Sequence, residues 1–593
     1  MRRPRAHTLL PIAALALATL AAAPTPATAA VRTATAVATQ PNGDAVANLW
    51  EWNWRSVTSE CTDRLGPAGF GGVQVAPPAE SVSIPDKGHP WWEVYQPVSY
   101  KLESRFGTRA EFAAMATACH NAGVRVIADT VVNHMAGSNN TVTSGYAGST
   151  FDPSGYAYPA VPYTRSDFHH PGDGCPTSSG GINDWNDATQ VQNCELVSLS
   201  DLYTQKDEVR AKIATYLNDL VSLGVDGFRV DAAKHVPQAD FAAILAKVGS
   251  TTWQHTRPYV AQEVMPGGSG VLAPSAFEEN GSLLDFVYAY KMKEQFNGDI
   301  ANLKTFGTSW GIEPSDKSYA MITNHDLERN GSTLTYKDAS YKPATYFMLA
   351  WPHGVPQVYD GFTFSNNDAS PPADSSGKVT DANCSSWQCV HRDQGVVGLV
   401  GWRNTAGTAP VANWSSPASN VIAFSRGAKG WLAINNSASP STATYTTGLP
   451  DGGYCDVVTG TATTSGCTGT KVTVSGGQAT VTVPAKSAVA LHVNATTTGG
   501  GTTPPPTTTT TVYVHKDVGW GNRITIRGSV APLSWSTGKD CVNQSAALWK
   551  CTIDGIPSGT SLEYKPLIND TTWSTGANFT TTAGQTTDIY PTF

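Results

Sequence analysis

A short run from Gly224 to Val230, apolar apart from Asp226 and Arg229, ends in the acid Asp231, and the cation Lys234 follows three residues later. Short, mainly apolar runs are typical of parallel strands buried on both faces. In barrel enzymes, the carboxyl ends of such strands hold the reactive side chains. The run therefore predicts a buried parallel strand that delivers a carboxylate to the rim of a barrel.

Three other apolar runs also finish in polar residues. A single carboxylate at a strand end is more often a helix cap or half of a loop ion pair than a catalytic group. Four such ends together predict one shared site. The three further ends are Asp129, Asn133 and His134 after Val124, Gln262 and Glu263 after Tyr259, and Asn324, His325 and Asp326 after Tyr319.

Strand-like runs alternate with helical ones, such as Glu208 to Leu223, as far as about Trp402. This alternation predicts a closed (β/α)8 TIM barrel, which we assign to residues 31–403. The strand-like runs are Ala45–Trp52, Gly71–Ala76, Val124–Val132, Val225–Val230, Tyr259–Val264, Leu283–Tyr288, Tyr319–Thr323 and Val355–Asp360. The connection between His134 and Asp201 is about 65 residues long, far longer than an ordinary barrel loop, and predicts an inserted domain at about 135–200.

Three further segments follow the barrel. Residues 404–495 show short Val, Thr and Ala alternations between turn residues, which predict a C-terminal antiparallel β-sandwich. Residues 496–511 contain only Thr, Gly and Pro and predict an extended linker with a reach of up to ~50 Å. Residues 512–593 predict a separate all-β module.

The N-terminus and the charge restrict the location and the ligand. Residues 1–30 carry three arginines, an apolar stretch and Ala27-Thr28-Ala29, which predict a signal peptide and a secreted, extracellular protein. Without those arginines the formal charge of -8 becomes about -11, which argues against nucleic acid or an anionic membrane surface as partner. No other apolar stretch approaches the roughly 20 residues of a membrane helix. We expect a monomer with a neutral ligand.

The ten cysteines predict a disulfide framework, because the chain is expected to be exported. No CxxC motif is present, which argues against a zinc or redox site. Their order suggests that neighbours pair: Cys61 with Cys119, Cys175 with Cys194, Cys384 with Cys389, Cys455 with Cys467 and Cys541 with Cys551.

Four segments resemble, in order, the signature regions of the alpha-amylase family of glycoside hydrolases, family 13: DTVVNH, GFRVDAAKH, AQEV and ITNHD. They are most similar to the branch that includes chloride-dependent enzymes. The resemblance implies endo-acting hydrolysis of α-1,4-glucosidic bonds in starch and related glucans with retention. It also implies Asp231 as nucleophile, Glu263 as acid and base, and Asp326 as a third carboxylate that grips sugar hydroxyls.

The residues around these carboxylates suit such chemistry. Arg229 lies two residues before Asp231 on the same strand face, and a nearby guanidinium keeps a carboxylate ionised. Glu263 must instead have a raised pKa to hold a proton near neutral pH.

The resemblance also implies a set of sugar-binding residues. The alternatives are histidines satisfied within the core and a tryptophan pair that only plugs the barrel mouth. The implied residues are Trp91, Trp92 and Tyr95 for stacking, and Gln96, His134, Arg229, Lys234, His235 and His325 for hydroxyl groups.

A calcium ion is implied by the same resemblance, with side-chain ligands from Asn133 and Asp201 and backbone carbonyls at about Gln192 and at His235. Related enzymes also hold a chloride ion with an arginine, an asparagine and a further basic residue. Arg229 and Asn324 are present, but Gln357 occupies the third position. We therefore do not expect chloride activation.

The last module resembles a family-20 starch-binding domain, with Leu533-Ser534 in place of the usual Gly-Asn. The resemblance implies sugar contacts from Trp535, Lys565, Trp573 and Asn578. Of its other tryptophans, we expect Trp520 and Trp549 to belong to the core.

Two other functions share parts of this pattern. A cyclodextrin glucanotransferase shares the three carboxylates but normally carries an additional immunoglobulin-like domain, for which about 90 residues between barrel and linker leave no room. A non-catalytic glucan-binding barrel would lack at least one of the three carboxylates.

Overall fold

The computed structural model of the chain describes residues 40–497, 507–530, 532–557 and 560–593. The predicted signal peptide lies outside the described residues, as does the middle of the predicted linker. No helix in the described ranges is long and apolar enough to cross a membrane.

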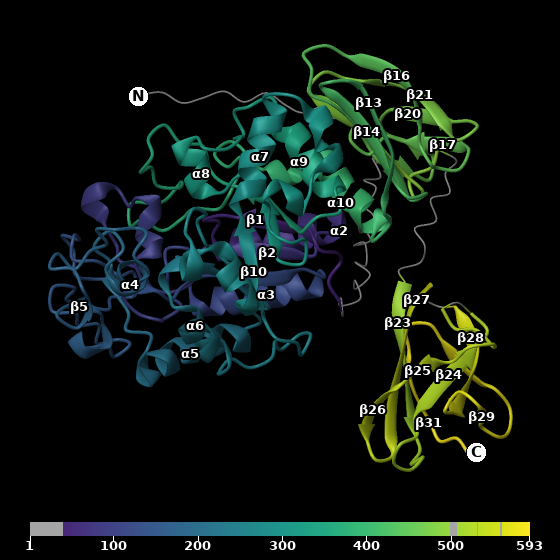
Figure 1. Cartoon of the computed structure of the whole chain (residues 1–593), viewed down its shortest axis with the longest axis horizontal. Coiled ribbons are helices and arrows are strands. Elements are labelled where there is room, and N and C mark those ends of the chain that lie inside the picture. Colours follow the sequence, from purple (N-terminus) through teal and green to yellow (C-terminus); the bar gives the residue numbers. More distant parts are fainter. Residues whose placement is uncertain (1–39, 498–506, 531, 558–559) are drawn as a thin grey trace, which may run out of the picture. The chain divides into compact units, whose positions relative to one another are not determined.

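Eight parallel strands close into a barrel, with β1 paired to both β2 and β12 (Figure 1). The predicted TIM barrel and all eight strand-like runs are confirmed. The run that begins at Leu283 is shorter than expected, because Asp285 accepts a hydrogen bond from the backbone N–H of Tyr288 and starts a helix there. The strands are β1 (Val46–Leu49), β2 (Gly72–Val75), β3 (Arg125–Val131), β8 (Gly227–Asp231), β9 (Tyr259–Gln262), β10 (Ser282–Asp285), β11 (Ser318–Met321) and β12 (Val355–Asp360).

Helices surround the strands in Figure 1. Local features of the sequence explain where these helices form. The helix α5 buries Ile213, Leu217 and Leu220 on one face, as the spacing of an amphipathic helix requires. The helix α3 begins with a capping box between Thr108 and Glu111. The main helices are α1 (Trp54–Glu60), α3 (Arg109–Asn121), α5 (Asp207–Ser222), α6 (Gln238–Leu245), α7 (Phe286–Phe296), α8 (His325–Asn330), α9 (Tyr341–Ala350) and α10 (Gln394–Ala406).

The long connection after β3 starts and ends at the same place. Its first strand, β4 (His134–Met135), pairs antiparallel with its last, β7 (Ser200–Asp201), and His134 lies opposite Asp201. Between them lie short elements such as α4 (Ala188–Asn193) and the disulfide Cys175–Cys194. The pairing brings two predicted site segments together at the base of this inserted segment.

The next domain is antiparallel. Its largest sheet has the order β13 (Val411–Ala418), β14 (Val421–Arg426), β15 (Gly430–Asn435) and β22 (Ser487–His492). Two smaller sheets pair β16 (Ser441–Thr446) with β21 (Gln478–Val483) and β17 (Gly452–Cys455) with β20 (Lys471–Val474). The indole N–H of Trp402, on α10, donates to the carbonyl of Leu491 at 2.8 Å and so joins the last barrel helix to β22.

The last module has a core of its own between two sheets. Its first strand, β23 (Thr507–His515), begins inside the segment assigned to the linker, because Thr510 is buried and its hydroxyl accepts the backbone N–H of Gly584. One sheet has the order β26 (Val542–Ser545), β27 (Leu548–Pro557), β23 and β31 (Thr586–Ile589). The other contains β24 (Ile524–Gly528), β28 (Ser561–Ile568) and β29 (Thr572–Trp573).

The two tryptophans assigned to this core behave differently. Trp549 is buried in it, as expected. The prediction for Trp520 is wrong, because its side chain is fully exposed. Gly519 and Gly521 flank it with φ of 75° and 84°, so it occupies a turn that carries the indole into solvent.

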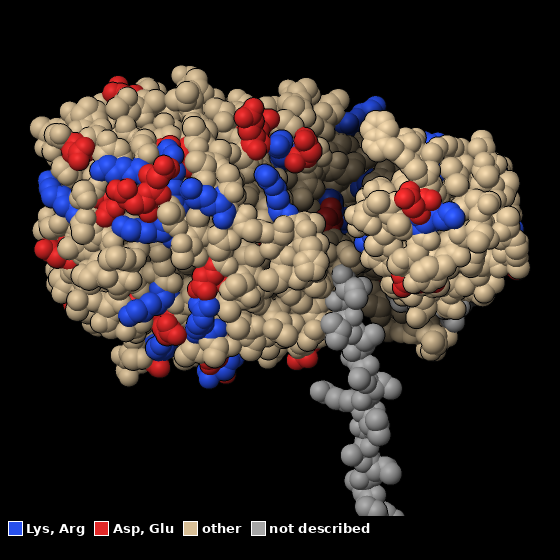
Figure 2. Space-filling model, turned by 90° about the horizontal axis from the view of Figure 1, so that it is seen from below, with Lys and Arg blue, Asp and Glu red and all other residues tan. Residues whose placement is uncertain are grey.

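All five predicted disulfides are confirmed. On the face that Figure 2 shows, acidic and basic side chains are interspersed over a largely uncharged surface.

Candidate active site

Three carboxylates lie at the carboxyl ends of the barrel strands β8, β9 and β11. Asp231 is the last residue of β8, Glu263 follows β9 directly, and Asp326 is the second residue of α8, just after β11. Parallel strands bring these ends to one rim of the barrel. The backbone N–H of Glu263 donates to Val230 at 3.0 Å, which joins the first two ends.

A single guanidinium, that of Arg229, contacts Asp231, Glu263 and a further carboxylate, Asp129. Arg229 is buried on β8, and its Nη1 donates to Asp231 Oδ1 at 2.7 Å and to Asp129 Oδ1 at 2.9 Å. Its Nη2 lies 2.9 Å from Glu263 Oε1. Three carboxylates therefore share one buried cation.

The turn after β8 is strained. Ala232 adopts φ 48° and ψ 33°, a left-handed conformation that costs a residue with a side chain of order 1 kcal/mol or more. In this conformation its backbone N–H donates to Glu263 Oε2 at 3.0 Å. Both oxygens of Glu263 are thus held, one by Arg229 and the other by the backbone beside Asp231.

Burial raises the pKa of Asp231, Glu263 and Asp326, and Arg229 opposes the rise in each. The charge of Asp326 also raises the pKa of Asp231, whereas the hydrogen bond from Arg229 lowers it, as the sequence led us to expect. The charges of both Asp231 and Asp326 raise the pKa of Glu263. Glu263 thus has two neighbouring carboxylates that favour its protonated form, and Asp231 has one.

The predicted histidines surround these carboxylates as neutral imidazoles. His134 Nε2 donates to the carbonyl of Tyr95 at 2.9 Å, and His235 Nδ1 donates to that of Val191 at 2.8 Å. Burial lowers the pKa of each to about 4. Burial likewise holds the pKa of His325 well below its usual range. Lys234 reaches the carbonyl of Met265 at 3.0 Å.

The predicted aromatic residues divide into two groups. Trp91 and Trp92, on the 3-10 helix η3 (Trp91–Tyr95), are partly exposed, and their indole N–H groups donate to Asn367 O at 2.7 Å and Asp368 Oδ1 at 3.2 Å. Their ring faces can therefore stack on a sugar while the indole edges are bound by the protein.

Tyr95 and Gln96 are buried instead. The Tyr95 hydroxyl donates to Asp129 Oδ2 at 3.0 Å, and Gln96 Oε1 accepts from Asn140 Nδ2 at 2.6 Å. The carbonyl oxygen of Gln96, expected to meet a sugar hydroxyl, is thus engaged by the inserted segment. Its amide nitrogen is the group left for such a contact.

Sequence reasoning missed Trp185 and Arg329, and it gave Asp129 no separate role. The side chain of Trp185 is 54% exposed, on the inserted segment, and its ring lies edge-to-face with that of His235 at 6.0 Å. A lone tryptophan in the polar stretch from Ile182 to Asn186 was a signal for it. Asp129 had been noted at a strand end without a role, and burial raises its pKa to about 7.

The predicted calcium ligands form two pairs, Asn133 with Asp201 at the base of the inserted segment and Gln192 with His235. The backbone N–H of Leu202 donates to the Asn133 carbonyl at 2.9 Å, and His169 Nδ1 donates to Asp201 Oδ2 at 2.7 Å. Asp201 Oδ1 is buried without a hydrogen-bond partner, and burial raises the pKa of this carboxyl to about 6. The bond from His235 to Val191 places His235 beside Gln192.

These donors suit a hard cation, since an unpaired buried carboxylate oxygen and backbone carbonyls are ligands that calcium accepts. Among the residues that the structure describes, no group of three or more His, Cys, Asp and Glu side chains could hold a metal. The predicted set would not form such a group, because it has one carboxylate and otherwise amide and carbonyl oxygens.

The predicted anion position differs from a complete three-donor site. Asn324 Nδ2 is buried without a hydrogen-bond partner, whereas Arg229 Nη2 lies 2.9 Å from Glu263 Oε1 and Gln357 Nε2 donates to Gln74 Oε1 at 2.9 Å. Asn324 Oδ1 also caps α8 by accepting the N–H of Leu327 at 2.8 Å. The asparagine donor is therefore free, and the other two are engaged.

In the last module, Trp535 and Trp573 face the solvent together. They are 39% and 40% exposed, with ring centroids 6.3 Å apart and planes at 32°. Lys565 Nζ donates to the carbonyl of Gly576 at 2.6 Å, and Asn578 Nδ2 donates to Glu563 Oε2 at 3.1 Å. The two exposed rings of Trp535 and Trp573 are called the aromatic cradle below.

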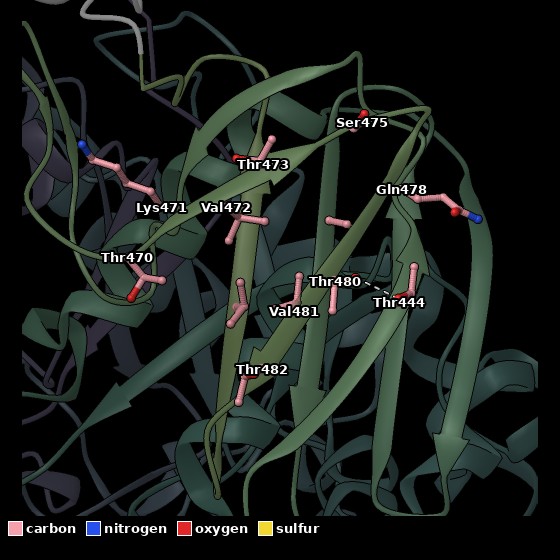
Figure 3. A pocket seen from close by; sticks show the side chains of 12 residues that line it. Thr444, Thr470, Lys471, Val472, Thr473, Ser475, Gln478, Thr480, Val481 and Thr482 are labelled. Carbon is pink, nitrogen blue, oxygen red and sulfur yellow. Dashed lines mark hydrogen bonds between the residues drawn. The ribbon is translucent and has the colours of Figure 1, made fainter.

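A hollow on the antiparallel domain lies outside this chemistry. Its walls carry Thr444, Thr473, Thr480 and Thr482 around the apolar floor of Val472 and Val481 (Figure 3). The described residues that line it include no aspartate or glutamate. It therefore lacks the pair of carboxyl groups that glycoside hydrolysis uses.

Comparisons with known proteins agree with this arrangement. Residues 95–258 match the profile described as the alpha amylase catalytic domain, and residues 412–494 match that of the alpha amylase C-terminal all-beta domain. A protein of Streptomyces violaceus named alpha-amylase is 44% identical over 91% of this chain and 91% of its own length. The pancreatic alpha-amylase of Sus scrofa is 40% identical over 74% of this chain and 91% of its own.

Solved structures resemble the chain as well. The crystal structure of alpha-amylase I from Eisenia fetida has a TM-score of 0.72 and 34% identity, and covers 77% of this chain and 99% of its own. A mutant of that protein was solved in complex with maltohexaose, with the same TM-score of 0.72 and 35% identity, covering 77% of this chain and 98% of its own.

Proposed function

Because this chain belongs to the alpha-amylase family of glycoside hydrolases, we propose that Asp231, Glu263 and Asp326 carry out its reaction. The enzyme is an alpha-amylase that hydrolyses α-1,4-glucosidic bonds of starch with retention. The observation that carries the assignment is the contact of one buried guanidinium, that of Arg229, with both Asp231 and Glu263.

The reaction has two steps. Glu263 gives its proton to the glycosidic oxygen while Asp231 attacks the anomeric carbon, so that the leaving glucan departs and a glycosyl ester forms on Asp231. Glu263, now ionised, then takes a proton from water, whose oxygen attacks the same carbon and releases Asp231. Asp326 holds sugar hydroxyls, and its charge stabilises the positive charge that develops on the ring.

Asp231→Asn and Glu263→Gln should each lower kcat by several orders of magnitude while starch binding and the melting temperature stay close to wild type, because each removes one step of the covalent mechanism. Steady-state kinetics on soluble starch measure this effect. Glu313→Gln is a control, because burial also raises the pKa of that carboxyl, to about 7, beside Asp285 and Glu278. A loss of only a few-fold in either site variant would contradict the assignment.

We propose a structural calcium ion held by Asn133, Asp201 and the carbonyls of Gln192 and His235. The unpaired oxygen of Asp201 supports this proposal. When bound, the ion supplies positive charge that ties the inserted segment to the barrel, and it takes no part in the bond cleavage.

Excess chelator should therefore lower the melting temperature and expose the inserted segment to protease, because ligand binding stabilises only the folded state. The Asp201→Asn variant should melt lower and respond little to chelator. Asp173→Asn, a change at a half-exposed aspartate of the same segment, should respond as the wild type does. Unchanged melting and proteolysis of the wild type in chelator would exclude the site.

We propose that residues 507–593 form a starch-binding domain of the family-20 type, with Trp535 and Trp573 as its sugar-binding faces and Lys565 and Asn578 beside them. The separate core and the exposed pair of rings support it. Together with the five disulfides, this fits an enzyme that is secreted and works on extracellular glucan.

Trp535→Ala with Trp573→Ala should weaken adsorption to starch granules and leave hydrolysis of soluble starch nearly unchanged, because a linked module contributes effective concentration rather than chemistry. The matched pair of tryptophan-to-phenylalanine changes keeps two ring faces and should retain most adsorption. The isolated fragment 507–593 should bind granules, whereas fragment 512–593 lacks half of β23 and should melt lower. Equal granule binding of wild type and the alanine variant would refute the cradle.

We propose that the enzyme needs no chloride. Arg229 contacts Glu263 directly, so a neutral residue at position 357 does not free the acid from a guanidinium. Burial nevertheless raises the pKa of Glu263, and the charges of Asp231 and Asp326 add to the rise. The proton is therefore retained without a bound anion.

Activity in halide-free buffer should equal activity with added chloride, and Gln357→Arg should create a chloride response, because a second guanidinium would lower the pKa of Glu263. Gln357→Glu, which adds no cation, serves as control. Several-fold activation of the wild type would instead assign an anion to the donors of Arg229 and Asn324.

A further inference from the structure

We propose that Arg329 is a positioning residue that couples Asp326 to Trp91 and Trp92. These two tryptophans are called the tryptophan wall of the active site below. The proposal rests on the roles given above to Asp326 and Trp91. Arg329 lies on α8, one turn after His325, and belongs to none of the motifs that the sequence singles out.

The first half of the coupling runs through α8. Arg329 Nη1 donates to the backbone carbonyl of His325 at 3.1 Å. The ring of His325 lies between those of Trp50 and Tyr95, with centroids 5.0 Å and 5.2 Å away and planes at 6° and 15°. The guanidinium also covers Trp50, 4.6 Å from its ring. Arg329 thus holds both the backbone beside Asp326 and the ring on which His325 stacks.

The second half runs through the loop after β12. Arg329 Nε donates to the carbonyl of Asn367 at 3.3 Å, and the same oxygen accepts the indole N–H of Trp91 at 2.7 Å. The next residue, Asp368, accepts the indole N–H of Trp92 at 3.2 Å. One carbonyl therefore links the guanidinium to the tryptophan wall.

The surroundings of the guanidinium suit a fixed planar cation. Its central carbon lies 5.0 Å from the Trp91 ring, 5.2 Å from Phe362 and 4.4 Å from Phe364, in addition to Trp50. Aromatic faces attract such a cation, and its planar fork can bond two carbonyls at set angles. A lysine keeps the charge but has no rigid fork, so charge and geometry can be tested separately.

The charge of Arg329 also acts on the carboxylate of Asp326. Arg329 and Arg229 both oppose the rise in the pKa of Asp326 that burial causes. His325 Nε2 lies 3.3 Å from Asp326 Oδ2. Arg329 thus favours the ionised form of the carboxylate that it also positions.

Arg329→Lys and Arg329→Gln are tested as full-length enzymes on maltoheptaose, with kcat, KM and melting temperature measured for each. Misplacement of a catalytic group by about 1 Å costs up to ~100-fold in rate, so we expect kcat to fall roughly 10- to 100-fold in both variants. KM should rise as well, because Trp91 loses its shared acceptor geometry. Arg55→Gln, at an exposed surface ion pair, should match the wild type.

A double-mutant cycle with Trp91→Phe tests the link through Asn367. The phenylalanine keeps a ring face and loses the indole N–H. If both side chains act through one carbonyl, the double variant should lose less in kcat/KM than the product of the two single losses. Independent losses would overturn the coupling, and wild-type kcat in Arg329→Lys and Arg329→Gln would overturn the positioning role.

These outcomes are distinct from failure of the proposed function. If Asp231→Asn and Glu263→Gln retained activity, the catalytic roles proposed for these carboxylates would be refuted, whatever the result for the Arg329 variants. If those variants are inactive and the Arg329 variants only melt at lower temperature, Arg329 serves stability alone.

Discussion

The active site depends on an imbalance of buried charge. One guanidinium, that of Arg229, faces Asp129, Asp231 and Glu263, and a fourth carboxylate, Asp326, lies near enough to raise the pKa of Glu263. One cation cannot neutralise so many buried carboxylates, so part of the negative charge must be removed by protons. An acid that holds a proton near neutral pH is a consequence of this shortage of positive charge.

The barrel produces that imbalance through strand register. In the parallel pairing of β3 with β8, Asp129 lies opposite Arg229, and Val131 lies opposite Asp231. Arg229 and Asp231 are two residues apart and so point to the same face. A slip of one residue would turn both away from Asp129. The fold and the chemistry are therefore set by the same hydrogen-bond ladder.

The sequence predicted whatever depends on local pattern. The eight strands could be recognised because each is a short, mainly apolar run, and the disulfides because neighbouring cysteines pair. The exposure of Trp520 and the start of β23 at Thr507 could not be recognised, because one depends on two glycine conformations and the other on a pairing partner far along the chain. Arg329 was missed for a similar reason, since the Asn367 carbonyl that it meets lies 38 residues away.

The pairing of β4 with β7 has a consequence for how such enzymes diversify. Because His134 lies opposite Asp201, the two ends of the inserted segment leave the barrel side by side. The length of the inserted segment can therefore change without a change in the barrel. The inserted segment can thus vary between related enzymes while the barrel stays the same. Parts of its interior, including the exposed Trp185, can therefore be replaced, provided that His169 still contacts Asp201 and the turn of α4 at Gln192 still lies beside His235.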